Sequence, residues 1–137
     1  MKTLYKLFKT KDEYEQSGVW LDFGSDIRIK VARAGGKNIK FISKYNKLMR
    51  KYGRAIDYDN MSEEESLQAL AELFADTIIL DWSNVTDENG IPLEFNRMNV
   101  IKVLKDLPDL FAIIRAEANK PSNFKDKDEY IEEAVKN

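Results

Sequence analysis

The sequence predicts an α+β fold, mostly helical and in a single domain over residues 1–137, in which an N-terminal β-hairpin is followed by four to five α-helices. Three observations predict it. Two short apolar runs near residues 20 and 30 flank a turn, most later apolar residues recur at helical spacing, and a chain of 137 residues suits one domain. The terminal stretches, about 1–16 and 121–137, are highly charged and of the kind that frays without a partner.

The hairpin is predicted by residues 19–23 (VWLDF) and 27–34 (IRIKVARA), which flank Gly-Ser-Asp at 24–26. In the second run Ile29 and Val31 alternate with charged residues, the two-residue period of a half-buried strand. Two such runs joined by a short loop are typical of a β-hairpin.

The first long helix is expected between Lys37 and Tyr52, where the apolar period changes to that of a helix, and Gly53 is its expected C-terminal stop. Its apolar side chains gather on one side of the helix, and the basic ones lie opposite. The apolar set is Ile39, Ile42, Tyr45, Leu48, Met49 and Tyr52.

The second long helix is expected to begin after Ser62, which stands three residues before Glu65 in a capping-box pattern. Its apolar residues can be followed through Phe74 and Ile78 as far as Leu80, and they occupy more than one side of the helix. We therefore expect this helix to lie at the centre of the core.

Two more helices are expected in the second half of the chain. Asn96 is a suitable N-cap for a short helix that carries Leu104, and Pro108 suits the first turn of another helix that ends near Pro121. A last amphipathic stretch, residues 125–137, either forms a helix or frays.

Residues 81–95, DWSNVTDENGIPLEF, raise the question of a calcium-binding loop. With Gly90 at the sixth position of an EF-hand loop, Asp87 and Asn89 fit, but Val85 at position one and Asn96 at position twelve do not. The same Asp-Glu-Asn-Gly residues suit a tight turn, which is the favoured interpretation.

The residue composition argues against an enzyme. The chain contains no histidine and no cysteine, which removes the commonest general base, the thiol nucleophile and the usual zinc ligands. The acidic run at 63–65 suits a helix first turn better than a metal site, and Gly35-Gly36-Lys37 lacks the pattern of a phosphate-binding loop. We therefore expect no catalytic residues, no metal and no cofactor.

The hydropathy pattern predicts neither a membrane span nor a signal peptide. No apolar run approaches 18 residues, and the first residues lack a long apolar segment. The expectation is a soluble intracellular protein.

The order of charges along the chain is more informative. Residues 27–54 carry ten basic and no acidic residues, and residues 55–96 carry eleven acidic and no basic ones. One interpretation is a solvated basic face that the acidic helix partly neutralises inside the domain. Another is a docking surface for an acidic protein partner or a second copy. Nucleic acid is a third, against which the net charge of −2 argues.

Several separated stretches resemble the tail assembly chaperones of long-tailed bacteriophages, from about Phe8 to Asn137 and in the same order. The most specific are GVWLDFG followed by ARAG, and the run LDWSNVTDENGIPLEF; LKDLPDLF, a later NF and the closing VKN add to them. Such chaperones bind the long helical tape measure protein, help tail tube subunits assemble around it, and leave before the virion is complete.

The resemblance implies a non-enzymatic protein of the host cell cytoplasm. Its expected partners are the tape measure protein, the tail tube (major tail) protein and further copies of itself, with no nucleic acid and no membrane. The alternative is a structural tail component retained in the virion. Candidate partner-binding residues come from the basic helix and the apolar part of the C-terminal stretch; they are Lys40, Lys44, Lys47, Arg50, Lys51, Arg54, Phe124, Tyr130 and Ile131.

Overall fold

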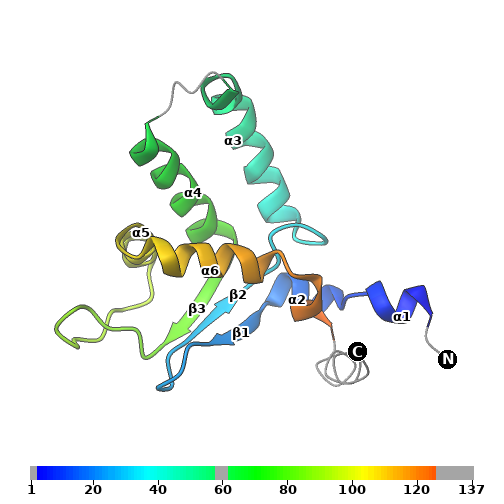
Figure 1. Cartoon of the computed structure of the whole chain (residues 1–137), viewed down its shortest axis with the longest axis horizontal. Helices are drawn as coiled ribbons and strands as arrows, with labels where there is room; N and C mark the ends of the chain where they lie inside the picture. The colour runs from blue at the N-terminus through cyan, green and yellow to red at the C-terminus, as the bar shows by residue number, and fades with distance from the viewer. Residues whose placement is uncertain (1–2, 58–61, 126–137) are drawn as a thin grey trace.

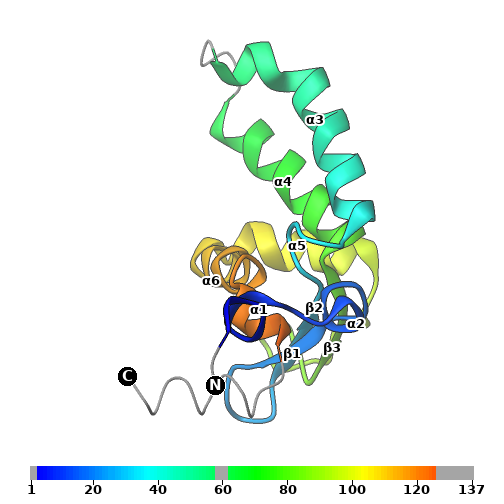
Figure 2. The ribbon, with the colours of Figure 1, turned by 90° about the vertical axis from the view of Figure 1, so that its right-hand side faces the viewer.

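A computed structural model of the chain describes residues 3–57 and 62–125 (Figure 1). It contains a small sheet, a group of helices over one face of that sheet, and two long helices that project away from both (Figures 1 and 2). In chain order the elements are α1 (Leu4–Phe8), α2 (Asp12–Ser17), β1 (Val19–Asp22), β2 (Arg28–Val31), α3 (Ile39–Asp57), α4 (Glu63–Thr77), β3 (Ile79–Ser83), α5 (Arg97–Asp106), α6 (Pro108–Ala118) and the 3-10 helix η1 (Pro121–Phe124).

The predicted fold class is wrong in its topology. The N-terminal hairpin exists, with Val19 opposite Val31 and Asp22 opposite Arg28, but it is part of a three-stranded antiparallel sheet in the order β1-β2-β3. The third strand follows α4, and it pairs with β2 so that Ile29 lies opposite Trp82. The helices are also not confined to the region after the hairpin, because α1 and α2 precede it.

The difference lies at residues 78–80, where the apolar spacing predicts a continuation of the preceding helix. That helix ends at Thr77, and the backbone carbonyl of Ile78 accepts a hydrogen bond from Ala32 N at 2.8 Å. The following residues are rich in β-branched and aromatic side chains, which favour a strand when an unpaired edge such as that of β2 lies beside them. A short apolar run of this kind does not distinguish strand from helix by its period alone.

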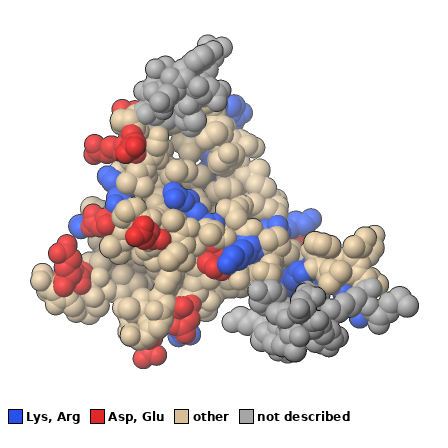
Figure 3. Space-filling model, viewed as in Figure 1, with Lys and Arg blue, Asp and Glu red and all other residues tan. Residues whose placement is uncertain are grey.

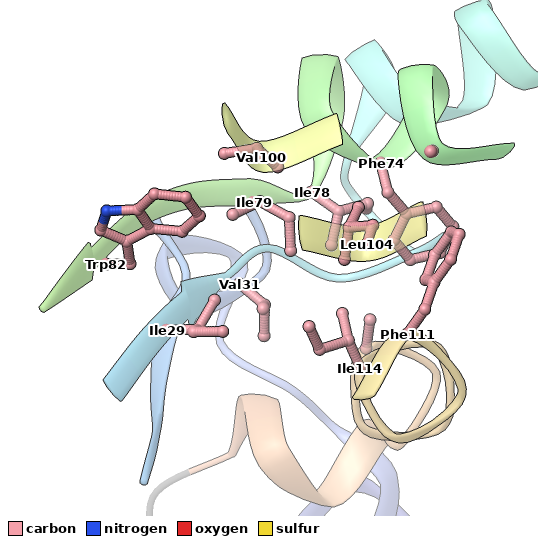
Figure 4. Packing of buried hydrophobic residues seen from close by; sticks show 12 residues of the cluster. Ile29, Val31, Phe74, Ile78, Ile79, Trp82, Val100, Leu104, Phe111 and Ile114 are labelled. Atoms are coloured by element: carbon pink, nitrogen blue, oxygen red, sulfur yellow. The ribbon is translucent and has the colours of Figure 1, made fainter. Parts of the chain in front are cut away.

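The core lies between the sheet and helices α4, α5 and α6 (Figure 4). Ile29 and Val31 of β2 point into it from the sheet, and Phe111 of α6 is fully buried opposite them. The rings of Phe74 and Phe111 meet edge to face with their centroids 5.2 Å apart. The opposite face of the sheet carries Trp20, which is 37% exposed, so the sheet is covered on one side.

Most of the other helix predictions are confirmed. Asn96 Oδ1 accepts a hydrogen bond from Asn99 N at 2.8 Å at the start of α5, and α6 begins at Pro108. The predicted stop at Gly53 is wrong, because α3 continues to Asp57. An isolated glycine costs a helix about 1 kcal/mol and does not by itself end it. The predicted helix over 125–137 lies almost wholly outside the described residues.

The N-terminal segment is fixed to the body by a buried carboxylate. Glu15 of α2 is 1% exposed and accepts hydrogen bonds from the Thr10 hydroxyl, the Arg33 guanidinium and the backbone amide of Lys37, the last at 2.7 Å. Lys11 N also donates to Phe124 O at 2.8 Å. The start of the chain, the end of β2 and η1 are therefore connected by polar contacts.

The predicted N-cap of α4 is confirmed and can be tested directly. Ser62 Oγ accepts a hydrogen bond from Glu65 N at 3.1 Å. The Ser62→Ala variant is expected to lower the free energy of unfolding by about 1 kcal/mol, because an amide of the first turn loses its acceptor. Urea unfolding followed by circular dichroism measures this loss. Ser66→Ala within the same helix is the control, and an equal effect of both changes would contradict the capping role.

Candidate partner-binding surface

Helices α3 and α4 run in opposite directions and form an arm that stands out from the sheet and from α5 and α6 (Figures 1 and 2). At the base of the arm, Phe41 of α3 meets Phe74 of α4 edge to face, with ring centroids 6.2 Å apart. Phe74 belongs to the core, so the arm is continuous with the packed interior at this end. Its outer turns present long helical surfaces to the surroundings.

The apolar side of α3 is only partly covered by α4. Ile39 is 75% exposed, Ile42 38% and Tyr45 40%, whereas Phe41 is half-buried and stacks on Tyr45. The sequence predicted that these side chains gather on one apolar face of the helix. In the structure a single neighbouring helix covers part of it, and the remainder is an apolar stripe, which we define as Ile39, Ile42 and Tyr45.

The predicted basic residues lie on the same helix. Within α3 the side chains of Lys40, Lys44, Lys47, Arg50 and Lys51 are all exposed. The side chain of Arg54 lies outside the described part of the chain. Figure 3 shows that basic groups also occur near the outer end of α3, whereas acidic ones gather at the outer end of α4.

One ion pair joins the basic helix to the acidic one. Lys44 Nζ lies 3.6 Å from Asp76 Oδ2, and Arg97 of α5 donates to the other oxygen of Asp76 at 2.7 Å. The hydrogen bond from Arg97 is the main cause that holds the pKa of Asp76 below its usual range, against burial, which raises the pKa, and with help from the charge of Lys44. The expected neutralisation inside the domain is therefore real at this position.

A groove of about 650 Å³ runs between α3 and α4. Lys44, Lys47 and Lys51 line it from α3, and glutamates of α4 line it from the other side. Lys105 of α5 stands at the groove as well and donates to Gln68 Oε1 at 2.6 Å. Three of the sequence-predicted residues are thus brought together in one concave surface, while Lys40 and Arg50 do not line it.

Among the predicted C-terminal contact residues, Phe124 lies in the described part of the chain, and it is not part of this surface. Phe124 is 0% exposed, which corrects its expected availability to a partner. It is the last residue of the 3-10 helix η1, which contacts α2. Burial of its large apolar ring stabilises the fold. Tyr130 and Ile131 lie outside the described residues. In the N-terminal stretch, Tyr5 and Phe8 of α1 are 80% and 72% exposed.

Residues 87–90 form the predicted tight turn. Asp87 Oδ1 accepts hydrogen bonds from the amides of Asn89 and Ile91 at 2.8 and 2.9 Å, and Gly90 has a φ of 78°. The carboxylate is thus used to hold its own backbone. Across residues 3–57 and 62–125, no three His, Cys, Asp or Glu side chains form a group that could hold a metal ion. No helix in that part of the chain has the length and apolar character needed to cross a membrane.

These features define an α+β protein with a projecting helical arm, and comparison with known families assigns its origin to bacteriophage. A family model described as YdaY prophage protein matches residues 35–137, most of the chain. The chain therefore belongs to the YdaY prophage protein family. The match includes the arm, β3 and the helices that follow, and it begins after β2. No curated protein and no solved structure matches the chain.

Proposed function

We propose that this protein is a phage tail assembly chaperone of the host cytoplasm, which binds the tape measure protein, helps tail tube subunits assemble and is absent from the mature virion. The observation that carries the proposal is the apolar stripe of α3 on a projecting arm, with Ile39 75% exposed. Large exposed apolar side chains on one face of a helix favour a protein partner. Membership of a phage-derived family and the resemblance of the sequence motifs add support.

The properties of the arm suit a long helical client. A client of this kind offers many similar apolar stripes, so its chaperone benefits from a surface that accepts helices of varied sequence. Ile42 and Tyr45 supply apolar contact on one side of α3. On its other side, at the groove, Lys44, Lys47 and Lys51 supply attraction that depends little on the exact partner sequence. Several copies bound along one client would gain from multivalency, even where each contact is weak.

The proposal is tested by co-expression with the tape measure protein of the same genome. The wild-type chain is expected to keep that protein soluble and to co-purify with it. The double variant Ile42→Ser/Tyr45→Ser is expected to retain several-fold less, because the apolar contact is removed from the arm. Ile91→Ser, at a 60% exposed residue of the turn outside the arm, is the matched control and should behave like the wild type.

Two outcomes would overturn the proposal. If the tape measure protein remains insoluble and unbound in the presence of the wild-type chain, the chain alone is not a sufficient chaperone. Stoichiometric amounts of the chain in purified virions, measured by mass spectrometry, would instead favour the alternative of a structural tail component.

A further inference from the structure

The groove between α3 and α4 has one basic and one acidic wall. Lys44, Lys47 and Lys51 recur at intervals of three and four residues along α3, while Glu65 and Glu72 stand seven residues apart on α4. A spacing of seven residues is two helical turns, roughly 10 Å along the axis. Both walls therefore carry charge with the same period, which is that of an α-helix.

The charges of the outer groove meet neutral groups rather than opposite charges where the described part of the chain contacts them: Lys51 Nζ lies 5.0 Å from the centre of the Tyr52 ring, and Glu72 accepts a hydrogen bond from Gln68. Within the described part of the chain, neither Lys47 nor Lys51 forms an ion pair, and the same holds for Glu65 and Glu72. Lys44 differs, since it is paired with Asp76 near the base of the arm. The basic and acidic walls thus face each other across the groove without closing it.

Between the two walls the groove presents apolar surface. Leu48 and Tyr52 contribute it from α3, and Ala69 and Leu73 contribute it from α4. Leu48, Tyr52 and Ala69 are each half-buried, so contact with a further apolar side chain would remove more of their surface from water. A volume of about 650 Å³ is large enough to receive several side chains of a partner.

We propose that this groove binds one α-helix of the client, so that α3, α4 and the client helix form a three-helix bundle. The bound helix carries an apolar ridge against Leu48 and Tyr52, acidic residues along the flank that faces Lys47 and Lys51, and basic residues along the other flank. An extended peptide would repeat its side chains at about 7 Å on one face and fall out of step with both walls. A nucleic acid would bring phosphate against the glutamates of α4.

This inference rests on the proposed function, and it is tested with the same client, the tape measure protein of the same genome. Three variants of the full chain are compared with the wild type by co-purification. Lys47→Glu/Lys51→Glu reverses the basic wall, and Ala69→Trp fills the groove without a change of charge. Lys40→Glu/Arg50→Glu is the matched control, because it reverses two exposed charges of the same helix that do not line the groove.

The expected result is that both groove variants retain roughly tenfold less client than the wild type, while the control retains a similar amount. Circular dichroism melting of each variant separates loss of binding from loss of folding. If the wild type binds and both folded groove variants bind equally well, the groove assignment is wrong and the chaperone function stands. If the wild type itself retains no client, the proposed function fails, and the groove assignment fails with it.

Discussion

Phe111→Ala is expected to lower the free energy of unfolding by about 3 to 5 kcal/mol, the largest effect of any single change considered for this protein. Phe111 is 0% exposed and lies between the sheet and the arm, where its ring contacts that of Phe74. Its removal leaves a cavity that the surrounding helices and sheet fill only partly. For a chain of this size we expect the melting temperature to fall by roughly 10 to 20 °C.

Thermal and urea unfolding of the purified variant measure this effect. Ile113→Ala is the matched control, since Ile113 lies on the same helix but is 50% exposed. The control is expected to cost less than about 1 kcal/mol. A similar loss in both variants would show that Phe111 is not central to the core.

Glu15→Ala is expected to lower the free energy of unfolding by about 2 to 3 kcal/mol at neutral pH. The change removes the acceptor for the Thr10 hydroxyl, the Arg33 guanidinium and the amide of Lys37. Arg33 is only 22% exposed, so it is left without its partner in a partly buried place. Glu13→Ala on the same helix changes an exposed glutamate and should have little effect.

The same carboxylate is expected to make the fold sensitive to acid. Burial raises the pKa of Glu15, but the hydrogen bonds from Thr10, Arg33 and Lys37 outweigh it, and the net pKa lies below the ordinary value of 4.5. Because the folded pKa is depressed, the contribution to stability is complete above the unfolded pKa and is lost as the pH falls through the folded pKa. Glu15→Gln should therefore lose less stability than the wild type between pH 7 and pH 3. Urea unfolding at the two pH values gives this difference, and equal losses would contradict it.

Local signals in the sequence predicted much of the fold. The β-hairpin, the caps at Ser62 and Asn96, and the start of α6 at Pro108 each follow from a few neighbouring residues. The third strand did not follow, because residues 79–83 become a strand only through pairing with β2, more than 40 residues earlier in the chain. The local spacing of apolar residues does not reveal such a long-range pairing.

The candidate surface was predicted in part. The order of charges drew attention to α3, and the structure brings Lys44, Lys47 and Lys51 into one groove. The apolar stripe was missed, because an apolar face at helical spacing looks the same whether its own chain or another molecule covers it. The prediction that Phe124 is available to a partner was wrong for the opposite reason. Its charged neighbours in the sequence suggested an exposed segment, but the fold buries Phe124 completely.

The position of the arm in the chain also separates the residues that stabilise the folded body from those that form the outer surface of the arm. The chain leaves the sheet after Val31 and returns at Ile79, and these two residues lie opposite each other in neighbouring strands. The arm is therefore an insertion whose ends meet at one rung of the sheet, where Ala32 N donates to Ile78 O. Its outer turns can gain, lose or exchange residues while the two ends keep their places. Under the proposed function, adaptation to a new client can thus proceed at the far end of α3 and α4, and the folded body need not be redesigned with it.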